Sequence, residues 1–247
     1  MIVYGHRGAR GEAPENTIAG CQHAVARGVR HLEIDLHLSK DGQLVVVHDA
    51  TVKKTVGSRG KVRSFSAREL AKMDARASGT PWPNKRGTGI STLTALVAAL
   101  PEIRHWQLEL KSGRSAYNNR LIDTLADWLQ ARPTGAGNKH PGYVVTCSQP
   151  TLLTEMKRQL PEQATGYVST IAYPNLIIES CACDYLVAHW STMNPFMLRG
   201  LQRRDVHISA WTVNDASVIE NLYRMHVDSI ITDYPSMAVP LVAALER

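Results

Sequence analysis

The sequence HLEIDLHLSKDGQLVVVHD, residues 31–49, places two β-rich runs on either side of an Asp-Gly pair. The two predicted strands cover residues 31–36 and 43–47. A parallel crossover needs about a dozen residues or more, whereas Asp-Gly is a common turn in antiparallel hairpins. With Asp41 and Gly42 as the turn, Asp35 pairs with His48. This stretch therefore predicts an antiparallel hairpin that returns His48 to the side of Asp35.

Short β-rich runs alternate with helical patterns on both sides of this hairpin. Predicted strands cover residues 2–5, 31–36, 106–110, 143–147, 166–169, 185–188, 207–211 and 229–232. Predicted helices cover residues 17–27, 93–100, 118–131, 151–160, 195–203, 216–225 and 236–245. Strands that alternate with helices form parallel βα units, and eight such strands predict an α/β fold, a (β/α)8 TIM barrel. Residues 1–247 are predicted to form a single barrel domain, with a basic insertion at about residues 50–90 after the second strand.

Length and composition limit the class of protein. The chain has 247 residues, 44% hydrophobic and 20% charged, which fits one large globular domain and excludes a disordered chain. Its longest apolar runs, such as residues 93–100, are too short to span a membrane, and its first residues form a predicted strand rather than a signal peptide. The four cysteines form no Cys-x-x-Cys pair, which favours a reduced, cytoplasmic protein.

The positive charge of the chain is concentrated in one segment. The net charge is +6, but residues 50–90 hold ten Lys and Arg against only Glu69 and Asp74, a net charge of +8. The rest of the chain therefore carries −2. Because active sites of barrels form on the face that carries such βα loops, we expect the segment to attract a small anionic substrate. A nucleic-acid surface is the alternative, but the segment has few aromatic residues on which bases could stack.

Ionisable side chains share one face of two predicted strands. Glu33 and Asp35 alternate with apolar residues in one strand, and Glu109 does so in the next. Carboxylates are costly to bury in a barrel wall without partners, but at the C-terminal strand ends they can line an open site. Three carboxylates form a hard oxygen site that suits Mg²⁺ or Ca²⁺ better than zinc. A structural ion-pair network is the alternative.

Basic and titratable side chains flank these carboxylates. Arg7, at the end of the first predicted strand, can grip a phosphate with two parallel hydrogen bonds, and Lys111, beside Glu109, can act as a point charge. His6 and His48 each end a strand, and two histidines that titrate near neutral pH can serve as general acid and general base. The sequence therefore predicts metal-assisted phosphoryl chemistry.

These residues belong to a series of motifs along the chain. The motifs are His6-Arg7-Gly8, Pro14-Glu15-Asn16-Thr17, Glu33-Ile34-Asp35, Ser39-Lys40-Asp41-Gly42, His48-Asp49, Glu109-Leu110-Lys111, Trp211-Thr212-Val213-Asn214 and Thr232-Asp233-Tyr234-Pro235. In these motifs and their order, the chain resembles the glycerophosphodiester phosphodiesterase family over residues 6–235. It departs from the family pattern at Gln149, where the family often has Phe, and at Ser91, where the family often has Pro.

The resemblance implies a barrel of the phospholipase-C-like type and a role for each matching residue. The implied roles are an acid–base pair, His6 and His48; phosphate ligands, Arg7 and Lys111; metal ligands, Glu33, Asp35 and Glu109; and supporting residues, Glu15 and Asn16. It also implies that Trp211 offers an aromatic wall to glycerol, with plain core packing as the alternative, and that Asp233 fixes the last loop.

The activity implied by the resemblance is hydrolysis of small anionic glycerophosphodiesters to glycerol 3-phosphate and an alcohol, with one divalent cation, Mg²⁺ or Ca²⁺. The alternative is lysophospholipase D-type hydrolysis of lysophospholipids, which needs an apolar groove near the mouth of the barrel. A catalytically inactive scaffold is disfavoured, because every expected ionisable group is present. We expect no nucleic-acid partner. The head group, the ion, the acid and base assignment, the nucleophile and the oligomeric state are left open.

Overall fold

The computed structural model describes residues 1–77, 81–132 and 142–247. Its strands are β1 (Ile2–His6), β2 (His31–Leu38), β3 (Leu44–Val46), β4 (His105–Leu110), β5 (Gly142–Cys147), β6 (Thr165–Ser169), β7 (Tyr185–His189), β8 (His207–Trp211) and β9 (Ser229–Thr232). Eight of them form a closed parallel ring in the order β1-β9-β8-β7-β6-β5-β4-β2, because β1 also pairs with β2. The predicted α/β TIM barrel is confirmed, and each of its strands lies within two residues of its predicted bounds.

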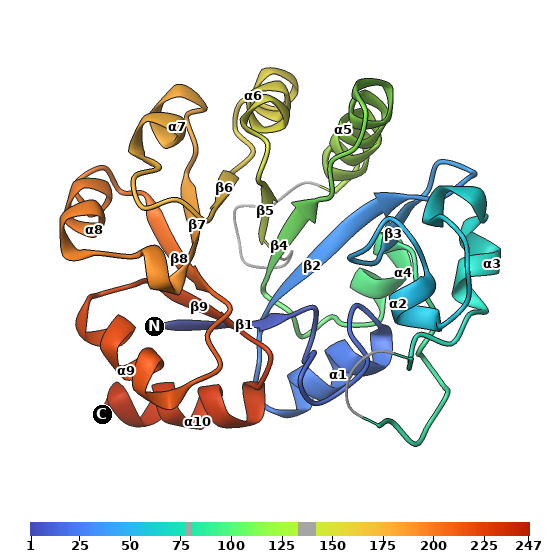
Figure 1. The fold of residues 1–247 in the computed structure, drawn as a ribbon, viewed down its shortest axis with the longest axis horizontal. Helices are drawn as coiled ribbons and strands as arrows, with labels where there is room; N and C mark the ends of the chain where they lie inside the picture. The colour runs from blue at the N-terminus through green and yellow to red at the C-terminus, as the bar shows by residue number, and fades with distance from the viewer. Residues whose placement is uncertain (78–80, 133–141) are drawn as a thin grey trace.

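Helices surround the ring of strands (Figure 1). They are α1 (Ile18–Ala26), α2 (Lys53–Val56), α3 (Ala67–Ala71), α4 (Leu93–Ala98), α5 (Ser115–Gln130), α6 (Pro150–Gln159), α7 (Asn175–Ser180), α8 (Pro195–Gln202), α9 (Ala216–Arg224) and α10 (Pro235–Leu245), with 3-10 turns η1 (Val62–Ser64) and η2 (Trp190–Thr192). Within the described ranges, none of these helices is both long enough and apolar enough to cross a bilayer.

The barrel wall has an apolar outer face and a more polar inner face. In β2, Leu32, Ile34 and Leu36 are fully buried in the hydrophobic layer beneath the helices. Glu33 and Asp35 alternate with them and are also buried, but on the opposite face of the strand. The period of two along β2 therefore places carboxylates inside the barrel.

The hairpin of β2 and β3 differs from the prediction by one residue in register. The strands pair antiparallel as predicted, but Val47 rather than His48 lies opposite Asp35, because the Val47 N–H donates to the Asp35 carbonyl. The loop has one residue more than predicted: Gly42 has a φ of 76°, and its N–H donates to the Ser39 carbonyl. A glycine in the left-handed region after a tight turn makes a three-residue hairpin loop. His48 therefore reaches the barrel only after the chain has left β3.

The basic insertion between β3 and α4 has a small hydrophobic core of its own. Val62, Leu70 and Ile90 are buried together with Val45 and Val47 of the hairpin. Helices α2 and α3 lie beside β3 at the right of Figure 1. The insertion is thus fixed to the strand that leads to His48 by apolar contacts, while most of its Lys and Arg side chains are exposed.

Aromatic and histidine side chains pack together at the N-terminal ends of the strands. The Tyr4 hydroxyl lies 2.9 Å from His105 Nδ1, and the ring centroids of Tyr185 and His207 are 4.4 Å apart. Burial lowers the pKa of His105 to about 4 and also lowers the pKa of His207. These imidazoles are therefore neutral in the folded protein at pH values where the unfolded chain is protonated.

We expect the protein to lose stability as the pH falls from about 6.5 to about 4. In this interval the unfolded chain protonates His105 and the folded protein does not, so the free energy of unfolding decreases by about 3 kcal/mol for this group and levels off at lower pH. Thermal unfolding across this range should show a shallower pH dependence for His105→Gln than for the wild type. His226→Asn, which removes an exposed histidine, is the control. Equal pH dependence in wild type and His105→Gln would contradict this account.

Candidate active site

Three carboxylates lie together near the C-terminal ends of β2 and β4. Parallel pairing sets Asp35 beside Glu109, and Glu33 precedes Asp35 by two residues on the same face. Ligand oxygens of Glu33, Asp35 and Glu109 all lie within 4.8 Å of one another. Glu33 is buried, and its Oε1 has no hydrogen-bond partner in the part of the chain that the structure describes. This set of oxygen ligands, with one unsatisfied buried atom, fits a hard divalent cation.

Two basic side chains contact the acidic cluster. Lys111 Nζ lies 2.8 Å from Asp35 Oδ1 and 2.6 Å from Glu109 Oε1, and Arg7 Nε lies 3.2 Å from Asp35 Oδ2. Burial alone would raise the pKa of Asp35, but Lys111 and Arg7 lower it. The pKa of Glu33 is raised by burial and by the neighbouring carboxylates of Asp35 and Glu109. These groups form one network, in which each buried charge depends on its neighbours.

Arg7 directly follows β1 and has a strained backbone conformation. Its φ is 50°, in the left-handed region that non-glycine residues rarely adopt, and its N–H donates to the Glu33 carbonyl over 2.8 Å. Glu15 Oε1 accepts a hydrogen bond from Arg7 Nη1 (3.2 Å), and Glu15 Oε2 accepts one from Arg10 Nε (3.1 Å). Glu15 therefore holds the Arg7 guanidinium beside the carboxylates, and the strain is concentrated at the site.

Asn16 contacts Asp35 directly. Its Nδ2 donates to Asp35 Oδ2 over 2.7 Å, and it too has a positive φ, 56°. The next residue, Thr17, caps α1 by accepting a hydrogen bond from the Gly20 N–H, as its residue type predicts. The loop before α1 therefore places Glu15 behind Arg7 and Asn16 behind Asp35.

His6 lies between the carboxylate of Asp233, which directly follows β9, and the acidic cluster. Its Nδ1 is 2.6 Å from Asp233 Oδ1, and its Nε2 is 3.8 Å from Glu33 Oε2. Asp233 Oδ2 accepts a hydrogen bond from Asn214 Nδ2 (2.7 Å). Burial alone would raise the pKa of Asp233, but the hydrogen bond to His6 lowers it. The family resemblance implies a loop-fixing role for Asp233, and in the structure Asp233 is also the hydrogen-bond partner that orients His6.

His48 is half-buried and is held from two directions. Its Nδ1 lies 2.9 Å from Asp49 Oδ1, and its backbone carbonyl lies 3.1 Å from His37 Nε2. His37 Nδ1 in turn lies 2.9 Å from the Tyr117 hydroxyl. Burial lowers the pKa values of both His37 and His48. His37 is not among the predicted site residues; the signal that could have found it is its place in β2, two residues after Asp35 on the same face of the strand.

One cavity of about 100 Å³ connects these groups. It is lined by His6, Arg7, Glu33, His48, Gln107, Glu109, Lys111, Thr146, Val168, Val187, Trp211 and Ile231. The Trp211 Nε1–H donates to the Val187 carbonyl over 3.0 Å, which fixes the indole in the wall. Three predicted site residues do not line the cavity but contact residues of the site. Asp35 contacts Lys111 and Arg7, Glu15 bonds to Arg7, and Asn16 bonds to Asp35.

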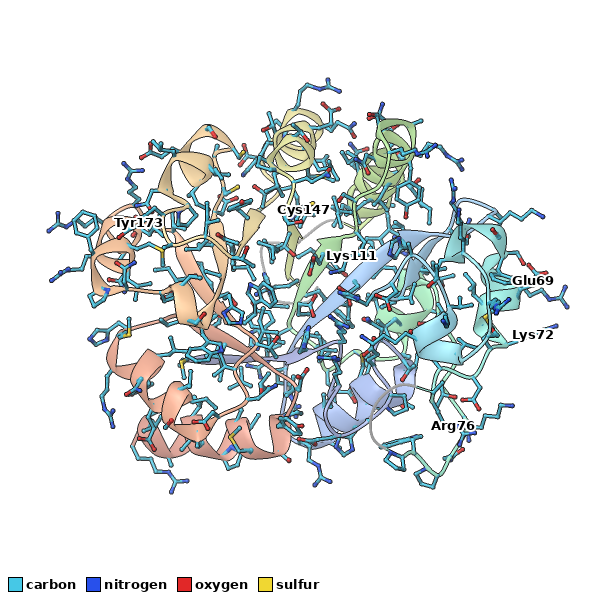
Figure 2. The ribbon with its side chains drawn as sticks, viewed as in Figure 1. Glu69, Lys72, Arg76, Lys111, Cys147 and Tyr173 are labelled. Atoms are coloured by element: carbon cyan, nitrogen blue, oxygen red, sulfur yellow. The ribbon has the colours of Figure 1, made fainter. Side chains whose placement is uncertain are left out.

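The arrangement suits acid–base chemistry on an anion. Both histidines keep Nδ1 in a hydrogen bond to a carboxylate, so each ring has Nε2 available for proton transfer. Arg7 and Lys111 supply positive charge beside the same cavity. Figure 2 shows Lys111 near the centre of the ring of strands, whereas Glu69, Lys72 and Arg76 of the insertion lie at the outer edge.

The chain matches the model of the glycerophosphoryl diester phosphodiesterase family over residues 6–237. It is 28% identical over 248 residues to the glycerophosphodiester phosphodiesterase of Caldanaerobacter subterraneus subsp. tengcongensis, covering 98% of this chain and 97% of that protein. It is 24% identical over 260 residues to lysophospholipase D GDPD1 of Mus musculus, covering 94% and 82%. The solved structure of an Oleispira antarctica phosphodiesterase, in complex with the product sn-glycerol-3-phosphate, superposes with a TM-score of 0.86 at 25% identity, covering 98% and 97%.

Proposed function

Because the chain belongs to the glycerophosphoryl diester phosphodiesterase family, we propose that it hydrolyses glycerophosphodiesters to glycerol 3-phosphate and an alcohol. The observation that carries this function is the family match over residues 6–237 together with two histidines and a carboxylate cluster beside one cavity. In this proposal residues 1–247 act as one domain, with residues 50–90 as its insertion. The four cysteines are free and buried, which supports a reducing, cytoplasmic environment.

Arg7 and Lys111 bind the phosphate of the substrate in this proposal. Both side chains line the cavity, and both are already aligned by carboxylates, Arg7 by Glu15 and Lys111 by Glu109. A guanidinium pre-positioned in this way loses little conformational freedom when a phosphate arrives. The two cations thereby offset the charge of the phosphodiester and the carboxylates that surround it.

His6 and His48 transfer the protons. With Nδ1 bonded to Asp233 or Asp49, each imidazole exchanges its proton through Nε2. One histidine takes the proton of the attacking hydroxyl, and the other gives a proton to the leaving alkoxide as the P–O bond breaks. The attacking hydroxyl belongs to water or to the glycerol of the substrate, and a cyclic phosphate trapped during turnover identifies the second case.

Glu33, Asp35 and Glu109 would hold one divalent cation, Mg²⁺ or Ca²⁺. When bound there, the ion stabilises negative charge that develops on the phosphoryl oxygens. Asn16 keeps the Asp35 carboxylate in place, and Glu33 contributes an oxygen that has no hydrogen bond within the described residues. Trp211 forms a wall for the glycerol moiety on the β8 side of the cavity.

Exposed apolar side chains near Trp211 favour a lysophospholipid as a second candidate substrate. The loops and first helical turns that follow β6 and β7 expose Ile171, Tyr173, Leu176, Trp190 and Phe196. The His189 ring lies 5.4 Å from Trp211 and 5.8 Å from Trp190, so an aromatic path leads from the cavity to these side chains. An acyl chain on the glycerol can follow this path. These exposed apolar side chains lie on the side of the barrel formed by β6–β8, opposite the insertion in Figure 1.

Choline release from glycerophosphocholine and from lysophosphatidylcholine, each with Mg²⁺ and with Ca²⁺, tests both candidates with one readout. We expect kcat/KM to be at least about tenfold higher for glycerophosphocholine, because the cavity of about 100 Å³ fits glycerol and phosphate without an acyl chain. A Leu176→Ser/Phe196→Ser variant should change only the turnover of the acylated substrate. A preference for lysophosphatidylcholine would reverse the order of the candidates, and no choline from either substrate would contradict the function.

A further inference from the structure

A second cavity, of about 300 Å³, lies beside the catalytic cavity. It is lined by His37, Leu38, Ala50, Thr51, Lys61, Val62, Arg63, Ser112, Gly113, Arg114 and Tyr117. These residues come from the hairpin, the insertion and the loop between β4 and α5. Its volume is at the lower end of the range of small-molecule sites.

Among the described residues, the lining of this cavity is largely apolar, with three exposed basic side chains at its edge and no acidic residue. Lys61, Arg63 and Arg114 contribute three positive charges, and none of them forms an ion pair within residues 1–77, 81–132 and 142–247. Arg114 also precedes the first turn of α5, a helix of 16 residues, and makes no side-chain cap there. The positive end of the helix dipole adds to the field of the three side chains. A doubly charged anion is the ligand that matches this field.

Two residues that line this cavity are close in the chain to residues of the candidate active site. Ser112 follows Lys111 directly, and Ala50 follows His48 by two residues. The His37 ring, which lines the cavity, also lies 3.1 Å from the His48 carbonyl. Because residues that line the two cavities are neighbours in the chain, we infer that a polyol attached to a phosphate between His48 and Lys111 extends toward this cavity.

The barrel topology places this cavity on the side opposite the glycerol wall. In the closed ring, β4 lies four strands from β8 in either direction. Trp211 ends β8, and the loop of Ser112–Arg114 follows β4. With glycerol against Trp211 and the phosphate in the middle, the leaving alcohol extends toward Arg63 and Arg114.

We propose that this second cavity binds a phosphomonoester carried by the leaving alcohol, so that the enzyme prefers glycerophosphodiesters of phosphorylated polyols. The proposal rests on the function given above and adds the substrate class. Lys61, Arg63 and Arg114 neutralise a group of charge close to −2, whereas a choline head group brings a positive charge to the same place. Within the described residues, these three cations have no ion-pair partner, the cavity has no carboxylate, and the proposed hydrolysis uses none of the three.

Glycerophosphoinositol and glycerophosphoinositol 4-phosphate form a matched pair that differs only in this group. Release of glycerol 3-phosphate by the wild type should have a kcat/KM at least about tenfold higher for the phosphorylated substrate. The ratio of the two kcat/KM values should fall toward one in an Arg63→Gln/Arg114→Gln variant. Inositol 4-phosphate should likewise inhibit the wild type more strongly than this variant.

The control is Arg68→Gln/Lys72→Gln, which removes the same charge from exposed residues of the insertion that do not line the cavity. Lys72 lies at the outer edge of the molecule in Figure 2. This variant should keep the wild-type ratio; an equal fall in both variants would indicate long-range attraction rather than a binding site. Equal turnover of the two substrates by the wild type would overturn the proposal. No product from either substrate would contradict the proposed function instead.

Discussion

Replacing His6 with glutamine should lower kcat for glycerol 3-phosphate release about a thousandfold. His6 lies between Asp233, 2.6 Å from its Nδ1, and Glu33, 3.8 Å from its Nε2, so its free nitrogen lies at the acidic cluster. Glutamine keeps a hydrogen-bond donor toward Asp233 but cannot take up and return a proton near neutral pH. KM should change much less than kcat, because Arg7 and Lys111 retain the phosphate contacts. Steady-state kinetics on glycerophosphocholine measures both constants.

His23→Gln is the matched control for this variant. His23 also pairs with a carboxylate, Glu12, at 2.7 Å, but it lies on α1 and does not line the cavity. The control should keep kcat within about twofold of the wild type. An Asp233→Asn variant should fall between the two, since it weakens the orientation of His6 without removing the imidazole. Near-normal kcat in His6→Gln would assign the proton transfers to other groups.

The fold could be predicted because the hydrophobic pattern of each segment agrees with its place in an alternating series of strands and helices along most of the chain. Alternation of strands and helices gives parallel βα units, and all eight barrel strands follow from it. The hairpin register could not be obtained in this way, since Asp41-Gly42 suits both a two-residue turn and the observed loop with Gly42 in the left-handed region. Helix α2, of four residues, is too short to show a helical period, and α7 was not predicted either.

The inner-face carboxylates could be predicted from the period of two along β2 and β4. The side chains that orient His6 and His37 could not be predicted, because they come from distant parts of the sequence. Asp233 reaches His6 across 227 positions, and Tyr117 reaches His37 across 80. Only closure of the ring by β1 and β9 brings the first pair together. A sequence pattern reports the face on which a side chain lies, whereas the contact itself depends on strand order.

The structure shows which basic residues of the insertion lie close to the active site. The insertion was expected to attract anions through its net charge of +8. Among the Lys and Arg residues of the insertion that the structure describes, Lys61 and Arg63 alone line the second cavity beside the active site. The other basic residues of the insertion contribute to a general field that salt screens, whereas these two contribute at short range. If the proposed second cavity binds substrate, we expect substrate attraction to have two components with different salt dependence.

Replacing Glu33 with glutamine should make the enzyme far less sensitive to Mg²⁺ and Ca²⁺ while stabilising the metal-free protein. The variant removes one of three carboxylates whose oxygens lie within 4.8 Å, so the concentration of ion needed for half-maximal activity should rise on the order of a hundredfold. Without metal, the same change removes a buried negative charge that lies beside two others, and the Tm in EDTA should rise above that of the wild type.

Thermal unfolding with and without Mg²⁺ or Ca²⁺ separates these opposing effects from a simple loss of folding. The Tm of the wild type should rise when Mg²⁺ or Ca²⁺ is added, because an ion that binds only the folded state stabilises it. The wild type should also lose activity in EDTA. Glu102→Gln, at an exposed carboxylate before β4 and thus at the other end of the barrel, should behave like the wild type in both measurements. Full activity of the wild type in chelator would contradict a metal at this site. An unchanged Tm response to the ion in Glu33→Gln would instead show that the ion binds without Glu33, and the carboxylates would then serve as a structural ion-pair network with Arg7 and Lys111.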